Sequence, residues 1–380
     1  MLTSGLRIDI GPLLLIFLAA LLFVLAATPV VKRVAHRYNV VDVPSARKIH
    51  AGPVPLLGGA AIYLAVIAAL LLYGHLSYVQ QTASILIGAT MMSMLGVWDD
   101  KWGLRPLAKL GGQVVAASLL YFTGVSVSFL HNDLLNYLAT VGWVVTVTNA
   151  LNLMDNMDGL ASGVAMVASI FFFLIATLTD QYLVAPLAAV LVGACAGFLF
   201  YNLNPASIFM GDAGSLFLGF MLAAVGIKLR FPENLDIVTW MVPVLVLGVP
   251  LFDTALVTLS RIRRGIPITR GGRDHLSHRL VALGFTRREA VLILYLIQGG
   301  LGIAALVVMQ ATVLEGYIVG LAILLAAVVG AYRLEQVDLT HTNPAPEGTP
   351  APVPLSARLP LSLRRKRPAE STKGDGSGAG

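Results

Sequence analysis

The sequence has very little charge. Asp, Glu, Lys and Arg make up 12% of its 380 residues, whereas 57% are apolar and the mean hydropathy is +0.81. A soluble domain carries roughly 25% charged residues, so this composition excludes an ordinary soluble protein and indicates an integral membrane protein. Cysteine is almost absent as well. Because the single Cys195 lies inside an apolar run, a disulfide framework within this sequence is excluded.

Apolar runs of roughly twenty residues recur along the chain, and each is long enough to cross a bilayer as a helix. They predict an all-α, polytopic integral membrane protein with about eleven transmembrane helices. No small-residue cleavage site follows the first run, so we expect a retained first helix rather than a signal peptide. The expected spans lie near residues 12–31, 56–73, 82–98, 106–123, 134–151, 160–178, 183–201, 213–228, 237–259, 290–310 and 313–332.

An excess of Lys and Arg marks the cytoplasmic loops of membrane proteins, and such an excess follows the first apolar run. It places the N-terminus outside and the C-terminus inside, and alternation of the loops then places the polar segments described below inside. The opposite loops are short and poor in basic residues, except for Lys228 and Arg230. The basic residues that follow the first run are Lys32, Arg33, Arg37, Arg47 and Lys48.

We expect a transmembrane domain over residues 1–337 and a disordered cytoplasmic tail over residues 338–380. The tail is rich in Pro, Gly, Ser and Ala, and its basic run at 364–367 can contact anionic lipid. The positive-inside loops explain the net charge of +6, so no nucleic-acid partner is predicted.

The most informative polar stretch is residues 149–163. Asn149, Asn152 and Asp155 are spaced three apart, which makes them near neighbours along one side of a helix. Asp158 continues the spacing, and Gly159 can end the helix there. Polar groups at membrane depth are costly, so this cluster predicts a functional site. The alternative is a hydrophilic loop between two helices.

A second polar stretch follows the first span, over residues 42–59. Arg47, Lys48 and His50 precede the flexible pair Gly58 and Gly59. Cations at this position suit a ligand that carries phosphate. The alternative is a positive-inside loop with no ligand.

Two adjacent carboxylates, Asp99 and Asp100, end the third predicted span. Anions at a helix C-terminus oppose the helix dipole, so a cation or a metal ion should compensate them. Oxygen ligands of this kind suit Mg²⁺, which takes its remaining ligands from water and substrate phosphate. Pairing with Lys101 or Arg105 is the alternative.

Asp212 lies near two glycines at the start of a later span. An Asp and backbone amides at a helix N-terminus can hold a metal ion together with a phosphate group. The alternative is a simple N-cap with glycine turns.

The last polar stretch, residues 261–279, contains His275 and His278, which face the same way if the stretch is helical. No Cys or third His accompanies them, which argues against zinc. Because Arg residues surround them, they favour contacts with a pyrophosphate. Asp253 is a weaker candidate, for which a helix–helix hydrogen bond is the alternative.

Together these segments indicate one cytoplasmic surface with many carboxylates and cations. This combination predicts a metal-dependent enzyme that acts on phosphate groups, and its place at the membrane predicts a lipid substrate. A transporter would need its polar groups near the bilayer midplane, and a scaffold would not need paired Asp residues at helix ends.

The combination of motifs resembles the polyprenyl-phosphate N-acetylhexosamine-1-phosphate transferases of glycosyltransferase family 4, from about residue 10 to residue 335. The matching elements are Gly58-Gly59, Asp99-Asp100, Asn-x-x-Asn-x-x-Asp-x-x-Asp-Gly from Asn149, Phe-Met-Gly-Asp-x-Gly-Ser from Phe209 and His-x-x-His-Arg from His275.

The resemblance implies transfer of a sugar 1-phosphate from a UDP-sugar to polyprenyl phosphate, with release of UMP. It implies Mg²⁺, with Mn²⁺ as an alternative ion, and a multi-pass protein of the bacterial plasma membrane whose active site faces the cytoplasm. The resemblance does not decide whether the protein forms a homodimer. Attack by the lipid phosphate is expected to be direct rather than through an aspartyl-phosphate.

The resemblance also implies roles for individual residues. Asp212 would bind the metal with Asn152 beside it, and Asp99 would deprotonate the lipid phosphate with support from Asp100. Phe209 would stack on uracil. Asp155, His275 and His278 would be further catalytic residues, and Lys48, His50, Lys109, Asp158, Asn202 and Arg279 would contact the nucleotide, the phosphates or the sugar.

The loop at His275 separates two branches of the family. The branch that uses UDP-MurNAc-pentapeptide typically has three consecutive His residues there, whereas this chain has His275-Leu-Ser-His278. The pattern is similar to the branch that uses UDP-GlcNAc for cell-surface glycans. Ser277 departs from the more usual His of that branch, so a related N-acetylhexosamine is an alternative.

Overall fold

The computed structural model describes residues 8–42, 53–73, 78–231, 234–269 and 271–339. Lys48, His50 and nearly all of the predicted tail lie outside these ranges. The described chain is helical apart from one two-residue antiparallel strand pair, β1 (Val41–Asp42) and β2 (Val54–Pro55). The helices are α1 (Ile10–Arg37), α2 (Gly58–Tyr73), α3 (Val79–Trp102), α4 (Pro106–Phe122), α5 (Asp133–Met154), α6 (Leu160–Leu178), α7 (Val184–Asn202), α8 (Gly211–Lys228), α9 (Asp236–Thr239), α10 (Met241–Val246), α11 (Gly248–Arg263), α12 (Leu276–Ala282), α13 (Arg287–Gln310) and α14 (Val313–Glu335).

The structure confirms an all-helical, polytopic membrane protein. Within the described ranges, eight helices are long and apolar enough to cross a membrane, namely α1, α3, α5, α6, α7, α8, α13 and α14. The apolar part of α2 is shorter, at Gly58–Leu72. Large apolar side chains are exposed along α1 and α14, as expected for helices that face lipid.

Three of the eleven predicted spans, 56–73, 106–123 and 237–259, are not among these eight helices, and the last of them is wrong. Residues 237–259 do not form a single helix but fall into parts of α9, α10 and α11. Pro243 and Pro250 lie in this stretch, and proline removes a backbone donor and clashes with the preceding turn. Pro250 is tolerated because it lies in the first turn of α11, directly after the break at Leu247. A hydropathy pattern does not register such breaks.

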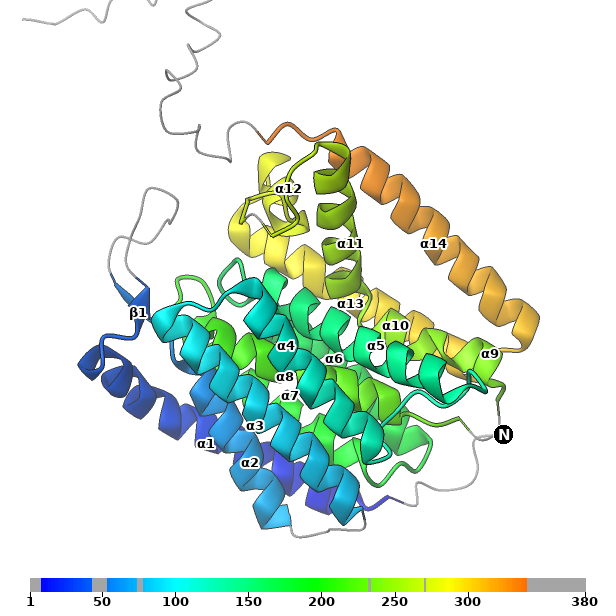
Figure 1. The fold of residues 1–380 in the computed structure, drawn as a ribbon, viewed down its shortest axis with the longest axis horizontal. Coiled ribbons are helices and arrows are strands. Elements are labelled where there is room, and N and C mark those ends of the chain that lie inside the picture. The colour runs from blue at the N-terminus through cyan, green and yellow to red at the C-terminus, as the bar shows by residue number, and fades with distance from the viewer. Residues whose placement is uncertain (1–7, 43–52, 74–77, 232–233, 270, 340–380) are drawn as a thin grey trace, which may run out of the picture.

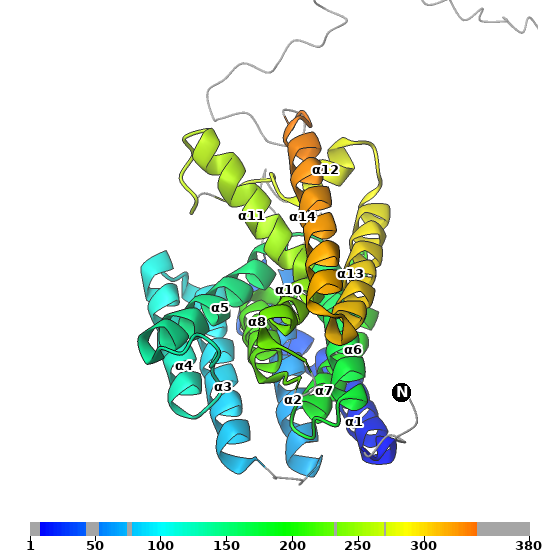
Figure 2. The same cartoon turned by 90° about the vertical axis from the view of Figure 1, so that its right-hand side faces the viewer.

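Helix α8 is the centre of the bundle (Figures 1 and 2), where it packs against α2, α3, α5 and α6. Every residue of α8 from Ala213 to Ile227 is buried. Small residues allow this close packing: a side chain at Gly59 would overlap the backbone of Gly214, and one at Gly96 would overlap the backbone of Asp212. The C-terminal end of α3 is thereby brought against the N-terminal end of α8.

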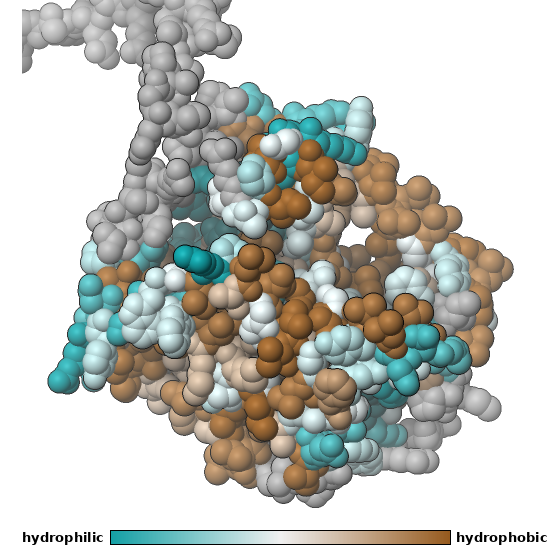
Figure 3. Space-filling model, viewed as in Figure 1, coloured by the Kyte–Doolittle hydropathy of each residue, from teal (hydrophilic) through white to brown (hydrophobic). Residues whose placement is uncertain are grey.

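Helices α11 to α14 form a second group beside the central bundle (Figure 1). Helix α13 of this second group connects it to the central bundle, because α13 packs against α6 and also against α10. In the space-filling view, apolar side chains cover much of the visible face of the bundle (Figure 3). The polar side chains discussed next come from helix ends and loops.

Candidate active site

Three helix ends meet in the predicted polar region: the C-termini of α3 and α5 and the N-terminus of α8. They bring together Asp99, Asp100, Asn152 and Asp212, which are far apart in the sequence. Helix α4 adds Lys109. The metal, catalytic and phosphate-binding residues predicted from separate motifs therefore lie in one cluster.

The two adjacent carboxylates of α3 are compensated differently. Asp100 accepts hydrogen bonds from the backbone N–H of Asp212 (2.8 Å) and of Ala213 (3.1 Å), so it caps the positive end of α8. Asp99 forms an ion pair with Lys109 (3.0 Å) and accepts a bond from the Leu104 N–H (2.6 Å). The expected compensation is thus present, with Lys109 as the pairing cation, whereas Lys101 lies over the Trp102 ring.

Lys109 is the cation at the centre of the cluster, and its side chain is only 15% exposed. Its ammonium group contacts Asp99 and Asp212 and donates to Asn152 Oδ1 (3.0 Å). Asn152 donates in turn to Asp212 Oδ1 (2.7 Å) and to Ser215 Oγ (2.8 Å). Asp212 is therefore not a simple N-cap, because its carboxylate is oriented by Lys109 and Asn152 from two other helices.

A second polar layer lies one helical turn away, between α4 and α5. Gln113 follows Lys109 by four residues, and Asn149 precedes Asn152 by three. The two amides form a reciprocal pair, with Asn149 Nδ2 donating to Gln113 Oε1 (2.6 Å) and Gln113 Nε2 donating to Asn149 Oδ1 (3.2 Å). Gln113 is fully buried. The pair fixes the two helices in the register that lets Lys109 and Asn152 meet.

A cavity of about 560 Å³ lies beside this cluster. Many predicted site residues line it: Asp100, Asp155, Asp158, Asn202, Phe209, Asp212 and His278. Arg273 and Arg287 also line it, although the sequence did not distinguish them from the other basic residues of the same loop. The cavity thus has carboxylates from the helix ends and cations from the segment around α12.

The turn after α5 presents Asp155 to this cavity. The predicted continuation of the helix to Gly159 is wrong, because α5 ends at Met154 and Gly159, with φ +77°, precedes α6. Burial, together with the charges of Asp212, Asp100 and Asp158, raises the pKa of Asp155 to about 8. Converging carboxylates of this kind stabilise one another only when a proton or a cation is shared.

Oxygen donors of this kind suit a hard divalent ion, which binds through one or two carboxylates. Asp155 and Asp212 line the same cavity. No group of three or more His, Cys, Asp or Glu residues arranged for a metal ion occurs among the described residues. The residues present therefore fit an ion that takes most of its ligands from water and substrate, and they do not fit an all-protein cage.

Asp158 and Asn202 line the cavity and also hold its wall together. Asp158 Oδ2 accepts bonds from Asn204 Nδ2 (2.9 Å) and from the Ala206 N–H (3.0 Å). Asn202 accepts from the Gly159 N–H (3.1 Å) and donates to the Ile208 carbonyl (3.0 Å). The substrate-binding roles predicted for both residues stay predictions. The observed bonds show that both residues link the 155–159 turn to the 202–208 loop.

Phe209 is placed by the strand-like segment that precedes α2. The N–H of Gly58 donates to the Phe209 carbonyl (3.0 Å), and the Phe209 N–H donates to the Pro55 carbonyl (2.8 Å). These bonds explain why the Gly58-Gly59 motif lies beside the Phe209 motif. The half-buried Phe209 side chain borders the cavity.

His275 and His278 do not lie on one face of a helix, contrary to the prediction. His275 precedes α12 rather than lying within it, and its buried ring pairs with Asp253 (2.8 Å). Asp253 also accepts the Leu276 N–H (2.6 Å), so it joins α11 to α12 as the helix–helix alternative expected. His278 alone of the two lines the cavity, and burial with the nearby His275 and Arg273 lowers its pKa to about 4.

Arg279 and Ser277 connect α12 to its surroundings. Arg279 is fully buried and donates to the carbonyls of Asp274 (2.9 Å) and Leu334 (2.6 Å) and to Ser260 Oγ (3.2 Å). It is not among the described residues that line the cavity. Ser277 donates to Asn156 Oδ1 (2.7 Å) and so joins α12 to the turn after α5. The unusual Ser277 therefore has a positioning contact, and substrate binding by Arg279 stays a prediction.

Comparison with known proteins agrees with this geometry. The sequence model of the family described as "Glycosyl transferase family 4" matches residues 82–230, which include the ends of α3, α5 and α8. The chain is 37% identical over 306 residues to the "Probable undecaprenyl-phosphate N-acetylglucosaminyl 1-phosphate transferase" of Bacillus subtilis (strain 168), a match that covers 78% of this chain and 85% of that protein. It is 34% identical over 325 residues to the "Decaprenyl-phosphate N-acetylglucosaminephosphotransferase" of Mycobacterium leprae (strain TN), with 76% of this chain and 82% of that protein covered. The chain therefore belongs to glycosyltransferase family 4, in its polyprenyl-phosphate N-acetylglucosamine-1-phosphate transferase branch.

Proposed function

We propose that the protein transfers N-acetylglucosamine 1-phosphate from UDP-GlcNAc to undecaprenyl or another polyprenyl phosphate. The products are polyprenyl diphosphate N-acetylglucosamine and UMP, and the lipid product starts a cell-surface glycan. The relatives described above support the reaction, and the site supplies the chemistry that it needs. Transfer of the MurNAc-pentapeptide phosphate is the alternative within the family.

One observation carries this proposal. Lys109 contacts the carboxylates of both Asp99 and Asp212, and the cavity that Asp212 lines is also lined by Arg273 and Arg287. Two anionic substrates must meet during the reaction, and cations lower their repulsion. A volume of about 560 Å³ lies within the range of sites that hold small molecules. A nucleotide-sugar in this cavity would extend between the cations and the carboxylates.

We propose that Asp155 and Asp212 hold the Mg²⁺ that the family implies. When bound, the ion would supply positive charge to the diphosphate of the donor. Asn152 orients Asp212 through its 2.7 Å hydrogen bond. Mn²⁺ is an alternative ion with the same oxygen chemistry.

The reaction is a direct displacement at phosphorus. An oxygen of the lipid phosphate attacks the phosphorus that carries the sugar, a new P–O bond forms, and the bond to UMP breaks. Asp99 takes the remaining proton of the lipid phosphate, and Lys109 holds that phosphate beside the cavity. Arg273 and Arg287 bind the negative charge of the donor, with the neutral His278 ring beside them, so catalysis depends mainly on position and electrostatics.

The proposed topology has the N-terminus outside, the C-terminus inside and the active site at the cytoplasmic face of a bacterial plasma membrane. The basic residues that follow the first span support it through the positive-inside rule. Both substrates fit this arrangement, because the nucleotide-sugar is soluble and the lipid reaches the site from the inner leaflet.

The proposal is tested by UMP release from purified protein with undecaprenyl phosphate and Mg²⁺, comparing UDP-GlcNAc with UDP-MurNAc-pentapeptide. We expect release with UDP-GlcNAc alone, and loss of release when EDTA removes the ion. Asp212→Asn should reduce turnover by about 100-fold or more, whereas Arg263→Gln, on the exposed side of the Arg263–Glu335 pair, should not.

Each other outcome has a definite meaning. UMP release with the pentapeptide donor alone would support the same transfer reaction but would place the protein in the branch that uses UDP-MurNAc-pentapeptide. An active Asp212→Asn protein with an unchanged Mg²⁺ response removes Asp212 as a ligand. Uptake of a UDP-sugar into vesicles without UMP release indicates a transporter and contradicts the proposal.

A further inference from the structure

A second cavity, of about 300 Å³, lies near the C-terminal end of α8, the end opposite Asp212. It is lined by Trp143 in the middle of α5, by Gly226 and Ile227 near the end of α8, and by residues of α9 and α10. Helix α8 spans about 27 Å at 1.5 Å per residue. The cavity therefore lies on the other side of the membrane-spanning bundle from Asp212 and takes no part in the reaction described above.

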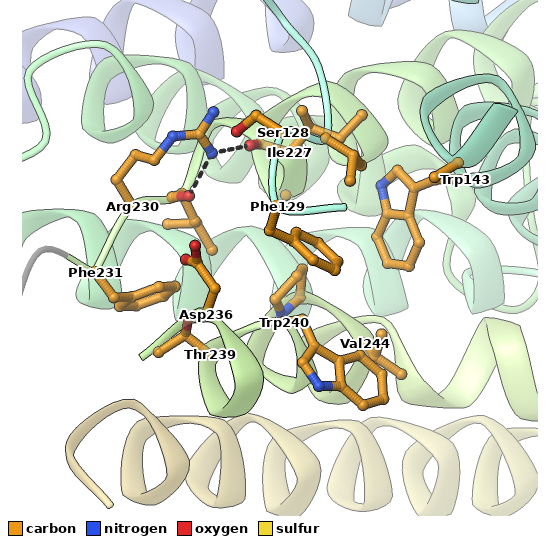
Figure 4. Close-up of a pocket in the computed structure, with 15 residues that line it drawn as sticks. Ser128, Phe129, Trp143, Ile227, Arg230, Phe231, Asp236, Thr239, Trp240 and Val244 are labelled. Atoms are coloured by element: carbon orange, nitrogen blue, oxygen red, sulfur yellow. Dashed lines mark hydrogen bonds between the residues drawn. The ribbon is translucent and has the colours of Figure 1, made fainter. Parts of the chain in front are cut away.

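The lining of this cavity is amphipathic (Figure 4). Phe129, Trp143, Trp240 and Val244 gather at one side, whereas Arg230 and Asp236 lie at the other. The indole N–H of Trp143 already donates to the Ala223 carbonyl (3.1 Å), so its ring offers apolar surface to the cavity. Such aromatic residues are typical of membrane–water interfaces.

The charged side of the cavity carries one cation, Arg230, and one anion, Asp236. Arg230 Nη1 donates to the carbonyls of Ile227 (2.7 Å) and Leu229 (2.9 Å), which fixes the guanidinium at the C-terminal end of α8. Asp236 is exposed, and its charge acts on Arg230. Arg230 Nη2 also donates to the Ser126 carbonyl (3.5 Å). A guanidinium has five N–H groups, so these three bonds leave others for an anion.

These charges also explain an anomaly in the sequence. Lys228 and Arg230 are the exception to the otherwise Lys- and Arg-poor loops on this side of the membrane. Basic residues are disfavoured in translocated loops, so their presence calls for a reason that the transfer reaction does not provide. An anionic group bound at this end of the bundle provides one.

We propose that this cavity binds one phospholipid of the outer leaflet that has a zwitterionic headgroup. Arg230 would bind its phosphate, Asp236 would bind its amine, and the upper part of one acyl chain would lie among Phe129, Trp143 and Trp240. A purely anionic headgroup is disfavoured because it has no ammonium group to pair with the Asp236 carboxylate. The lipid would join α5 and α8 to the α9–α10 segment, where the predicted single span is broken.

The test is native mass spectrometry of the full-length protein after removal of lipid, with phosphatidylethanolamine or phosphatidylglycerol added back. We expect one phosphatidylethanolamine to be retained in preference to phosphatidylglycerol. The preference should be roughly tenfold, as expected for one charge-assisted bond, and Asp236→Asn should remove it. Asp133→Asn, which removes another exposed carboxylate at the same end of α5 but outside the cavity lining, should leave the preference unchanged.

A second variant tests the apolar side without changing any charge. Val244→Trp fills the cavity and should abolish retention of either lipid, while a cooperative thermal unfolding transition in detergent reports that the variant is folded. Equal retention of both lipids by the wild type and all variants would overturn the proposal. So would a preference for phosphatidylglycerol or an absence of retained lipid. None of these readouts depends on the proposed transferase reaction.

Discussion

Asp100 and Asp212 line the same cavity, and Asp100 Oδ1 also accepts a hydrogen bond from the Asp212 backbone N–H at 2.8 Å. The second oxygen of Asp100 accepts the Ala213 N–H. Asp100 therefore binds the helix end from which Asp212 projects, whereas its neighbour Asp99 binds Lys109. Two consecutive carboxylates thus have different structural positions, and their substitution should have different effects.

Asp100→Asn should lower stability as well as activity. The amide that replaces one carboxylate oxygen would point N–H groups at the backbone N–H groups of α8, which leaves buried donors unpaired at a cost of about 1–3 kcal/mol. Asp99→Asn should reduce turnover with less change in the unfolding temperature, because Asp99 pairs with Lys109 and does not cap the N-terminus of α8. Thermal unfolding in detergent, measured beside UMP release, separates the two effects. Equal losses of stability in both variants would contradict this division.

The amide pair of Gln113 and Asn149 should control turnover from outside the cavity. Gln113→Leu leaves the Asn149 amide without its partner and loosens the contact between α4 and α5. We expect kcat to fall while KM for UDP-GlcNAc stays near the wild-type value, because Lys109 and Asn152 are displaced but the nucleotide contacts are not.

A double-mutant cycle with Gln113→Leu and Asn149→Leu measures the pair directly. Interhelical hydrogen bonds in membranes contribute about 0.6 kcal/mol on average and at most about 1.7 kcal/mol, so a coupling energy in this range is expected. The double variant should regain stability relative to either single variant without regaining kcat. Additive effects on stability would show that the two amides act independently.

Arg287 should contribute to donor binding. Its side chain lines the cavity from the first residue of α13, together with Arg273 and His278. Arg287→Gln removes a charge that would face the diphosphate, so KM for UDP-GlcNAc should rise by roughly tenfold. Arg263→Gln is the matched control, because Arg263 pairs with Glu335 rather than lining the cavity. An unchanged KM in the Arg287 variant would place the donor elsewhere.

The ion pair of Arg261 and Asp274 should make stability sensitive to acid. Burial alone would raise the pKa of Asp274, but the Arg261 guanidinium, at 2.7 Å, holds that pKa below its ordinary value of 3.8. Because the pKa of Asp274 is lower in the folded protein, the ion pair contributes its full stability when the pH is above 3.8, the ordinary pKa. This stability is lost as the pH falls through the lower pKa of the folded state. As the pH is lowered from neutral, the unfolding temperature of the wild type should therefore fall mainly below pH 3.8.

Asp274→Asn provides the comparison for this pH profile. It leaves the buried Arg261 without its carboxylate, a change that costs about 3–5 kcal/mol in comparable pairs. The variant should be less stable at neutral pH and should show a weaker dependence on acid. A profile parallel to that of the wild type would assign the acid sensitivity to other carboxylates.

Much of the site could be predicted because its residues end apolar runs. Asp99, Asn152 and Asp212 stand out in the sequence because carboxylates and amides at membrane depth require partners. Their convergence could not be derived from spacing alone, since it depends on the close packing of α8 against Gly59 and Gly96. Lys109 was assigned through the resemblance, and the structure shows its position between two carboxylates.

The errors have local physical causes. The helix through Asn149 ends at Met154 because Asn202 and the Ala206 N–H, from another part of the chain, bind the following turn at Gly159 and Asp158. His275 and His278 separate because α12 begins at Leu276, whose N–H is bound by Asp253. Arg287 was not distinguished from its neighbours because a basic loop contains many cations, and only tertiary structure selects those that face the cavity.

The complete burial of α8 has a consequence for how the enzyme can move. Asp212 is attached to a helix that has no surface on lipid between Ala213 and Ile227, so fluctuations of the bilayer reach it only through other helices. Asp212 therefore keeps its position relative to the neighbouring helices when the bilayer deforms, and His278 and Arg287 reach the same cavity from α12 and from the start of α13.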